Sequence, residues 1–268
     1  MADDLDEEWW LNNQDEPQNH SDDGRFVKLT EDEAKENEKD VPVKRKLTES
    51  SNSNKKRKWK RRKITEELKQ NAPKQGEAKD VMAAIQKHCE AKLTAADWEQ
   101  MKLDSDHFFD SNTDSLRPSI YLKLVLPKWS KMLKKKKDLK AGCPLVLIIA
   151  SSAIRSVELI REIAPFKGEG TKTAKLFAKH FKLKEQTEFL SKTVIHIGVG
   201  TPNRINALLT NGALKLKTVN AVVIDWNWRD VKSHRLVDIP EVFSDLMVLF
   251  KTFLCQHLQE NQCKIGLM

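Results

Sequence analysis

The sequence predicts an α/β fold in which one parallel sheet is covered by helices on both faces. Three short segments are nearly continuous in Val, Ile and Leu, as strands buried on both faces must be: residues 144–150, 193–199 and 220–225. Segments with the apolar spacing of amphipathic helices lie between them. Strands that alternate with helices form a parallel sheet through right-handed crossovers. We expect residues 76–268 to form this single domain.

Two helical stretches precede the first of these strands. Apolar residues recur every four positions from Val81 to Leu93, which predicts a helix that starts near residue 77. A second stretch follows Pro118. Pro127 is expected to break it, because proline lacks the amide hydrogen that a helix interior needs.

Helices are also predicted between and after the strands. Ser151 or Ser152 can cap a helix that must end before Pro165. The other expected helices are residues 173–181, residues 184–190, a short helix from Arg204 to the Asn211–Gly212 stop, and a last helix that starts at Pro240.

The first 75 residues differ in composition from the rest of the chain and are predicted to form a disordered, charged tail. Residues 1–40 hold fifteen acidic residues against four basic ones, a net charge of −11. Residues 41–63 hold eleven basic residues against Glu49, a net charge of +10. Blocks of like charge at this density repel themselves, and few aliphatic residues are present to be buried.

The basic run has two interpretations. Nuclear import and an electrostatic clamp on nucleic acid both need clustered cations, so the pattern predicts a polyanionic partner without choosing between them. The candidate nucleic-acid contacts in this run are Lys55, Lys56, Arg57, Lys58, Arg61, Arg62 and Lys63.

Several classes of protein are excluded by what the sequence lacks. The acidic N-terminus is unlike a secretory signal, and no apolar run approaches the roughly 18 residues of a membrane span. The four cysteines lack CxxC spacing, which favours reduced thiols and predicts no metal site. We therefore expect a soluble, intracellular protein that does not contact a membrane.

Polar segments follow all three predicted strands: ASSAIRS at 150–156, GTPNRI at 200–205 and DWNWRD at 225–230. In parallel sheets, ligands bind outside the carboxyl ends of the strands. These segments are distant in sequence, yet we expect them to share one rim of the sheet.

The order and spacing of these segments resemble the first lobe of a DEAD-box helicase. LIIASSAIRSVELI is laid out like the helicase motif PTREL with its helix, VGTPNRI is close to the TPGR motif, and VVIDWNWRD lies where the DEAD tetrad stands. The resemblance covers roughly residues 140–235 and implies a RecA-like domain. With the EEWW start, the basic run and LFAKH at 176–180, the chain is similar to the Cms-one ribosomal small-subunit homolog family, nucleolar proteins linked to early small-subunit assembly.

The chain departs from the helicase pattern where ATP must bind. A phosphate-binding loop needs glycines, because their backbone amides approach the phosphates closely. No glycine occurs between Gly76 and Gly142, the part of the chain in which such a loop would precede the first strand. We therefore expect no nucleotide cofactor.

The DEAD position is also degenerate. Asp225 matches the first residue of the tetrad, but Trp226 replaces the glutamate that would orient the attacking water. Asn227 and Trp228 complete the tetrad without supplying a general base. The resemblance therefore implies an inactive relative with no catalytic residue and no metal.

The resemblance implies RNA contacts at the turn after the second strand. In the helicase pattern the threonine and arginine of TPGR contact RNA phosphates, and Thr201 and Arg204 occupy these positions, with Asn203 in place of the glycine. A helix cap with a surface arginine is the structural alternative. The further candidate contacts near the rim are Ser151, Ser152 and Arg155.

The tryptophans beside the third strand have two interpretations. Trp226 and Trp228 could pack against a neighbouring helix, which is favoured, or form a surface for stacking or docking just past the strand end. Trp9 and Trp10 lie in the acidic tail, where a linear docking motif is expected.

The expected function is that of a non-enzymatic RNA- or ribonucleoprotein-binding factor in the nucleolus. Its expected partners are pre-ribosomal RNA and small-subunit assembly proteins, which it would bind as a monomer within a larger ribonucleoprotein. Two alternatives are a protein-interaction module that docks an assembly partner through Trp226 and Trp228, and a divergent NTPase that uses Asp225.

Overall fold

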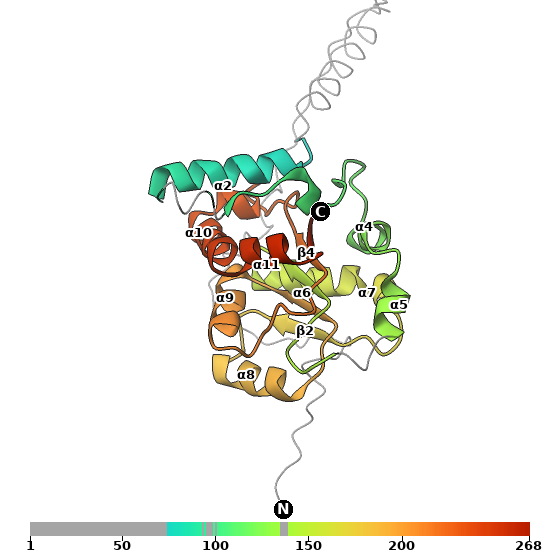
Figure 1. Cartoon of the computed structure of the whole chain (residues 1–268). Helices are drawn as coiled ribbons and strands as arrows, with labels where there is room; N and C mark the ends of the chain where they lie inside the picture. The colour runs from blue at the N-terminus through green and yellow to red at the C-terminus, as the bar shows by residue number, and fades with distance from the viewer. Residues whose placement is uncertain (1–73, 93, 95–98, 100, 135–138) are drawn as a thin grey trace, which may run out of the picture. The chain divides into compact units, whose positions relative to one another are not determined.

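Five parallel strands form one sheet in the computed structural model, in the spatial order β2, β3, β1, β4, β5 (Figure 1). The structure describes residues 74–268 except 93, 95–98, 100 and 135–138. The strands are β1 (Val146–Ile149), β2 (Thr173–Leu176), β3 (Ile197–Gly200), β4 (Ala221–Ile224) and β5 (Lys264–Leu267). All pairs are parallel, which confirms the predicted α/β class.

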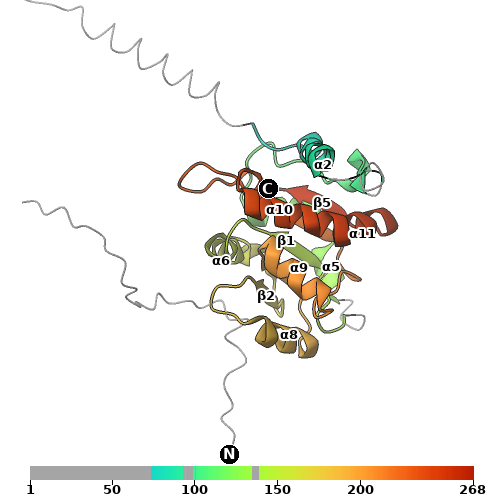
Figure 2. The same ribbon diagram turned by 90° about the vertical axis from the view of Figure 1, so that its left-hand side faces the viewer.

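Helices cover both faces of this sheet (Figures 1 and 2). One face carries α2 (Ala78–Lys92), α8 (Leu183–Lys192), α9 (Pro202–Thr210), α10 (Pro240–Leu249) and α11 (Cys255–Glu260). The other face carries α4 (Pro118–Val125), α5 (Trp129–Lys134), α6 (Ala153–Glu162) and α7 (Ala164–Lys167). Short turns η2 (Ser105–His107) and η4 (Leu236–Asp238) and a π-helical segment, η5 (Phe250–Leu254), complete the described elements. None of the helices described is long and apolar enough to span a bilayer.

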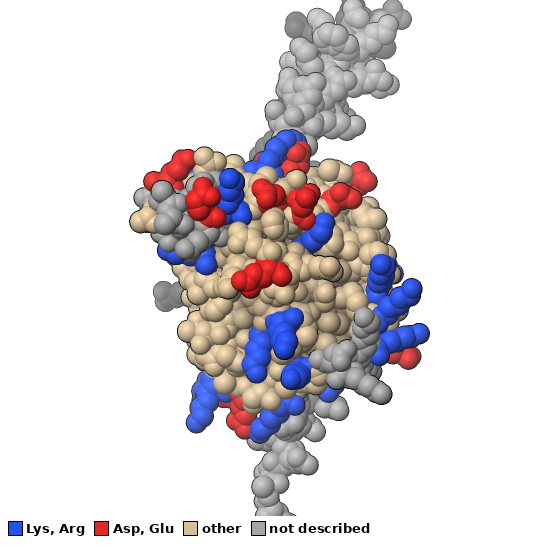
Figure 3. All heavy atoms as spheres, in the orientation of Figure 1, with Lys and Arg blue, Asp and Glu red and all other residues tan. Residues whose placement is uncertain are grey.

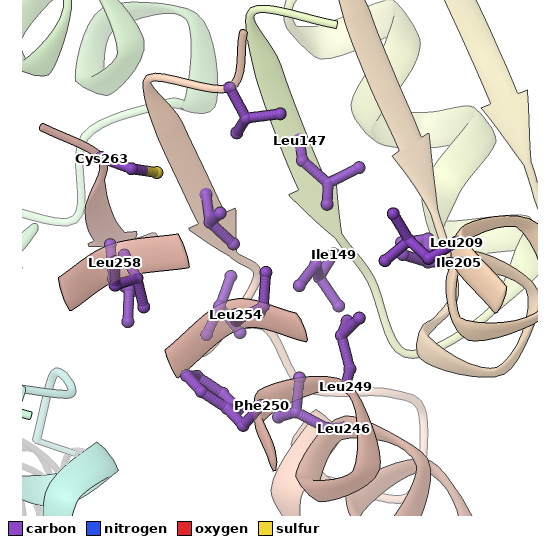
Figure 4. Close-up of a cluster of buried hydrophobic side chains, with 14 of the residues drawn as sticks. Leu147, Ile149, Ile205, Leu209, Leu246, Leu249, Phe250, Leu254, Leu258 and Cys263 are labelled. Atoms are coloured by element: carbon purple, nitrogen blue, oxygen red, sulfur yellow. The ribbon is translucent and has the colours of Figure 1, made fainter. Parts of the chain in front are cut away.

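Alternation along the strands divides the interior into two cores. Successive side chains of a strand point to opposite faces. Leu147 and Ile149 of β1 therefore pack with helices α9 to α11 and with η5, which contributes Leu254 (Figure 4). Val146 and Ile148 pack on the opposite face with α4, α6 and α7. Burial on both faces explains why these strands are continuously apolar.

The structure corrects two of the sequence predictions. Residues 173–181 were expected to be helical, but Thr173–Leu176 form β2 at the edge of the sheet. The helical prediction was wrong because apolar residues in this short segment fit both periods, whereas pairing with β3 selects the extended form. Strand β5 was missed, since Lys264–Leu267 offers only two large apolar residues.

Candidate nucleic-acid interface

The three polar segments lie together at the carboxyl ends of β1, β3 and β4, which are neighbours in the sheet. We call this edge the rim and define it as residues 150–152, 177–182, 201–204 and 225–235. Parallel pairing in register places these strand ends side by side, as the sequence predicted.

Arg155 and Asp225 form a buried ion pair at the rim. Nε of Arg155 donates to Oδ2 of Asp225 at 2.8 Å, and Nη2 donates to Oδ1 at 3.3 Å. The two side chains are 7% and 2% exposed. Nη1 donates to Glu158 at 3.2 Å and to Glu162 at 3.0 Å. The guanidinium also lies 5.0 Å from the ring centroid of Trp228. Its edges therefore donate hydrogen bonds to carboxylates, and the group as a whole also contacts an aromatic ring.

This pair changes the role of both residues. Burial raises the pKa of Asp225, and the hydrogen bonds and charge of Arg155 oppose that rise. Burial lowers the pKa of Arg155, but the hydrogen bonds and charges of Asp225 and Glu162 together raise it above its usual value. Arg155 was predicted to contact RNA, whereas its guanidinium is bonded to Asp225 and shielded from solvent. Both carboxylate oxygens of Asp225 accept hydrogen bonds from Arg155, so they are not free to hold a metal ion.

Arg204 supports the edge of the sheet through Gln186. Nη1 of Arg204 donates to Oε1 of Gln186 at 2.8 Å, and Nη2 donates to the carbonyl of Phe181 at 3.1 Å. Nε2 of Gln186, a buried residue, donates to the carbonyls of Lys175 and Phe177, each at 3.0 Å. Because β2 is an edge strand, Gln186 supplies hydrogen bonds that a further strand would otherwise make.

Arg204 is therefore more than the surface arginine or phosphate contact that the sequence predicts. It is partly buried, and burial lowers its pKa. Two of the five N–H donors of an arginine are used in these bonds. The sequence analysis did not identify Gln186. The one feature that could have indicated its role is that a polar residue lies on the buried side of a predicted helix.

The hydroxyl residues of the rim differ in how they are used. Ser152 caps α6 and accepts a hydrogen bond from the N–H of Arg155 at 3.2 Å, in line with the predicted cap at Ser151 or Ser152. Ser151 is buried. Thr201 is the N-cap of α9, but its side chain makes no capping hydrogen bond, and Pro202 follows it. The partly exposed hydroxyl of Thr201 is thus better placed to meet a ligand than either serine.

Trp226 and Asn227 fix the entry of the chain into the domain. Trp226 is 2% exposed and packs in the core, as favoured by the sequence. A Cβ atom on Gly76 would overlap the indole of Trp226, so only glycine lets the backbone pass this close. Oδ1 of Asn227 accepts a hydrogen bond from the N–H of Gly76 at 2.7 Å. Trp226 and Asn227, which differ from the helicase pattern, therefore make contacts within the folded domain.

Asp230 shapes an exposed turn at the end of DWNWRD. Its Oδ1 accepts the N–H groups of Lys232 and His234, both at 2.8 Å. The hydrogen bond from His234 is the main cause that lowers the pKa of Asp230. Arg229 closes the turn by donating to the carbonyl of Ser233 at 3.1 Å, and Ser233 has a left-handed φ of 64°. The sequence analysis did not predict this turn.

Exposed basic residues follow the strand end that is hydrogen-bonded to Thr201. The N–H of Thr201 donates to the carbonyl of Leu176, the last residue of β2, at 3.1 Å. The loop that leaves β2 therefore starts beside Thr201, and it presents Lys179, His180 and Lys182 to solvent. These residues were missed as rim residues because the segment was expected to be helical.

A glycine-free turn occupies the place of a phosphate-binding loop. Phe108 pairs in parallel with Ile265 of β5, and α4 starts at Pro118. Residues 108–125 thus run from a single β-bridge through a loop into a helix, an order similar to that around such a loop. The connecting residues 110–117 contain no glycine.

Hydrogen bonds close this turn against α4 and β5. Asn112 donates to the carbonyl of Leu116 at 2.9 Å and accepts its N–H at 2.8 Å. The hydroxyl of Tyr121, a fully buried residue, donates to the carbonyl of Asp110 at 3.0 Å and accepts the N–H of Leu267 at 3.1 Å. The backbone N–H of Leu267 at the end of β5 is therefore hydrogen-bonded to a side chain of the protein.

Some predicted residues lie outside the described part of the chain. These are the basic run of residues 41–63, with its seven candidate contacts, and Trp9 with Trp10. In the described ranges, no group of His, Cys, Asp or Glu could hold a metal ion. The described cysteines Cys143, Cys255 and Cys263 are buried free thiols.

Comparisons with known proteins identify relatives over the whole chain. Residues 25–268 match the family model described as "CMS1: U3-containing 90S pre-ribosomal complex subunit". Protein CMSS1 of Xenopus laevis is 38% identical over 280 residues that cover 100% of both chains. Protein CMSS1 of Homo sapiens is 38% identical over 195 residues, 73% of this chain and 69% of the relative. A solved DEAD box protein from Methanococcus jannaschii overlaps 53% of this chain and 36% of its own, with 17% identity and a TM-score of 0.31.

Proposed function

Because the chain belongs to the CMS1 family of U3-containing 90S pre-ribosomal complex subunits, we propose that it is a non-enzymatic RNA- or ribonucleoprotein-binding factor in small-subunit assembly. A role in such a complex fits a nuclear location, and we propose the nucleolus. The proposed partners are pre-ribosomal RNA and small-subunit assembly proteins, bound by a monomer within a larger ribonucleoprotein. In this proposal residues 76–268 are the folded domain and residues 1–75 are a charged tail.

The ion pair between Arg155 and Asp225 carries the non-enzymatic part of the proposal. Metal-assisted phosphoryl transfer needs a carboxylate that is free to hold magnesium. Asp225 instead accepts two hydrogen bonds from Arg155 and is 2% exposed. The glycine-free turn of residues 110–117 also supports a non-enzymatic role, since its polar groups form hydrogen bonds within the turn and with Tyr121 of α4.

The RNA-binding part is supported by charge and by the groups left available at the rim. The chain has a formal net charge of +8. Thr201 has a hydroxyl that does not cap its own helix, and the exposed Lys179 and Lys182 follow the neighbouring strand end. A neutral donor beside two cations is suited to phosphate oxygens.

RNA binding by the full chain tests this proposal at the rim and in the tail separately. We expect Lys179→Glu with Lys182→Glu to weaken binding to structured RNA by about tenfold or more, because two phosphate contacts become repulsive. Thr201→Val should weaken it less. Lys87→Glu, an exposed lysine on α2, is the matched control and should have a smaller effect.

The salt dependence of affinity measures the contribution of the basic run. Replacing the seven candidate contacts of the basic run with glutamine should reduce the salt slope by about 0.7 for each lost contact with single-stranded RNA. If neither the rim variant nor the tail variant changes affinity or slope beyond the control, the RNA-binding proposal fails.

The two alternative functions lack a supporting observation in the described residues. Docking of a partner on Trp226 and Trp228 requires exposed rings, but Trp226 is in the core and Trp228 lies against Arg155. A divergent NTPase would need Asp225 free of Arg155. We therefore keep the RNA- or ribonucleoprotein-binding factor as the proposed function.

A further inference from the structure

A groove lies at the amino ends of β4 and β5, on the side of the sheet opposite the rim. Its larger part is a cavity of about 640 Å³ bordered by the turn between α4 and α5, by α11 and by Lys264, the first residue of β5. A second cavity of about 290 Å³ adjoins the first and shares Met132, Asn220, Asn261 and Gln262 with it. Together they have the size of a typical binding cleft. We call them the amino-end groove.

The groove combines an apolar floor with a basic margin. Leu126, Met132 and Leu258 contribute to its floor. Lys128 and Lys264 border the larger cavity and are exposed. Lys217 borders the smaller one, and among the described residues that line the two cavities Asp106 is the one with a carboxylate. Figure 3 shows this side of the molecule, where Lys and Arg side chains gather around the position of α5.

This chemistry suits a large apolar side chain carried by an acidic peptide. Phosphate groups of RNA would meet the lysines but would leave the apolar floor without a partner. A tryptophan can fill such a floor, because it buries a large surface with little loss of side-chain freedom. Carboxylates next to it in sequence would then lie near the lysines at the margin, where opposite charges attract.

The chain itself carries such a peptide outside the described residues. Residues 3–11 read DDLDEEWWL, with five acidic residues followed by two tryptophans and a leucine. More than sixty residues separate this segment from residue 74, and each spans up to about 3.3 Å when extended. The connection is therefore long enough to reach any face of the domain.

We propose that residues 3–11 dock in the amino-end groove of the same molecule, with Trp9 or Trp10 on the apolar floor and the acidic residues at the lysine margin. Tethering raises the local concentration of the segment, so even a weak contact is well populated. The proposal is independent of the RNA-binding function, because it uses neither the rim nor the basic run.

A photo-crosslinker at position 10 of the full chain tests this contact. The photoreactive amino acid p-benzoylphenylalanine replaces Trp10, and the products are mapped by mass spectrometry. We expect crosslinks within one molecule to residues 125–134 and 258–264. Lys128→Glu with Lys264→Glu should lower the crosslink yield about threefold to tenfold, because two attractions become repulsions. Met132→Glu should lower it as well.

Controls separate a lost contact from a lost fold. Lys87→Glu with Lys232→Glu reverses two exposed lysines away from the groove and should leave the yield unchanged. Thermal unfolding of every variant should match that of the unsubstituted chain. Crosslinks mainly to residues 41–63, crosslinks between two molecules, or a yield that the groove variants leave unchanged would each overturn the proposal.

Discussion

Arg155→Ala should destabilise the domain strongly, because it leaves the carboxylate of Asp225 buried without a cation. Asp225 is 2% exposed and accepts two hydrogen bonds from Arg155. Arg155→Lys should recover only part of the loss, since a lysine offers a point charge in place of the planar fork that meets both carboxylate oxygens.

The size of the effect follows from the burial of each partner. Removing one member of a buried ion pair costs about 3–5 kcal/mol. Glu158 and Glu162 are 45% and 41% exposed, so their pairs with Arg155 add little. Contact with Trp228 adds about 0.5–1 kcal/mol. In proteins of 150–250 residues, 1 kcal/mol shifts Tm by about 2–4 °C, so a total loss of about 3.5–6 kcal/mol should lower Tm by about 7–24 °C.

Thermal unfolding of the full chain, followed by far-ultraviolet circular dichroism, measures this loss. Arg161→Ala removes an exposed arginine from the same helix and should cost less than about 0.5 kcal/mol. The double variant Arg155→Met with Asp225→Leu should regain most of the stability, because it removes both charges together. If Arg155→Ala keeps its Tm but loses RNA affinity, Arg155 is a ligand contact and the structural reasoning is refuted.

Three further predictions test the edge, the closed turn and the rim. Arg204→Ala should cost about 1–3 kcal/mol in chemical denaturation, because the buried Oε1 of Gln186 loses its donor; a loss no larger than that of the exposed neighbour in Asn203→Ala would contradict this. Burial raises the pKa of Tyr121, the single tyrosine of the chain, to about 12, so its absorbance at 295 nm should not change near pH 10 in the folded protein. Its folded state retains the proton, so about 3 kcal/mol of stability should be lost as pH rises from 10 to 12; ionisation near pH 10 before unfolding would exclude the buried hydroxyl. Calorimetry should show no saturable ATP binding at millimolar magnesium, and micromolar binding abolished by Asp225→Ala would restore the NTPase alternative.

The sequence predicts the centre of the fold better than its edges. Strands β1, β3 and β4 are buried on both faces, and their largely apolar sequences predict this burial directly. Strands β2 and β5 lie at the edges, where each is paired with one other strand of the sheet. Both are mixed in composition, so pairing with a distant segment decides their form, and this pairing cannot be read from a local pattern.

The candidate site shows the same limit at the level of single residues. Topology places Ser152, Thr201 and Asp225 on one rim, and the sequence predicts this from strand order alone. Which cation meets Asp225 depends on how α6 packs on the sheet, because Arg155 and Asp225 are seventy residues apart in the sequence. The use of Arg204 depends likewise on Gln186, which reaches it from another helix. Side-chain pairs between residues so far apart in the sequence can be identified only from the three-dimensional structure.

The rim of this domain is held together by its own side chains. In an ATP-dependent enzyme, a metal ion and phosphates would occupy the carboxyl ends of these strands. Here Arg155 neutralises Asp225, Trp226 fills the core, and Asn227 holds the backbone at Gly76. These contacts form within the domain itself, so binding at the rim need not order these side chains first. An RNA partner would then meet a preformed surface and gain affinity from the groups that the fold leaves unused, chiefly the hydroxyl of Thr201 and the lysines after β2.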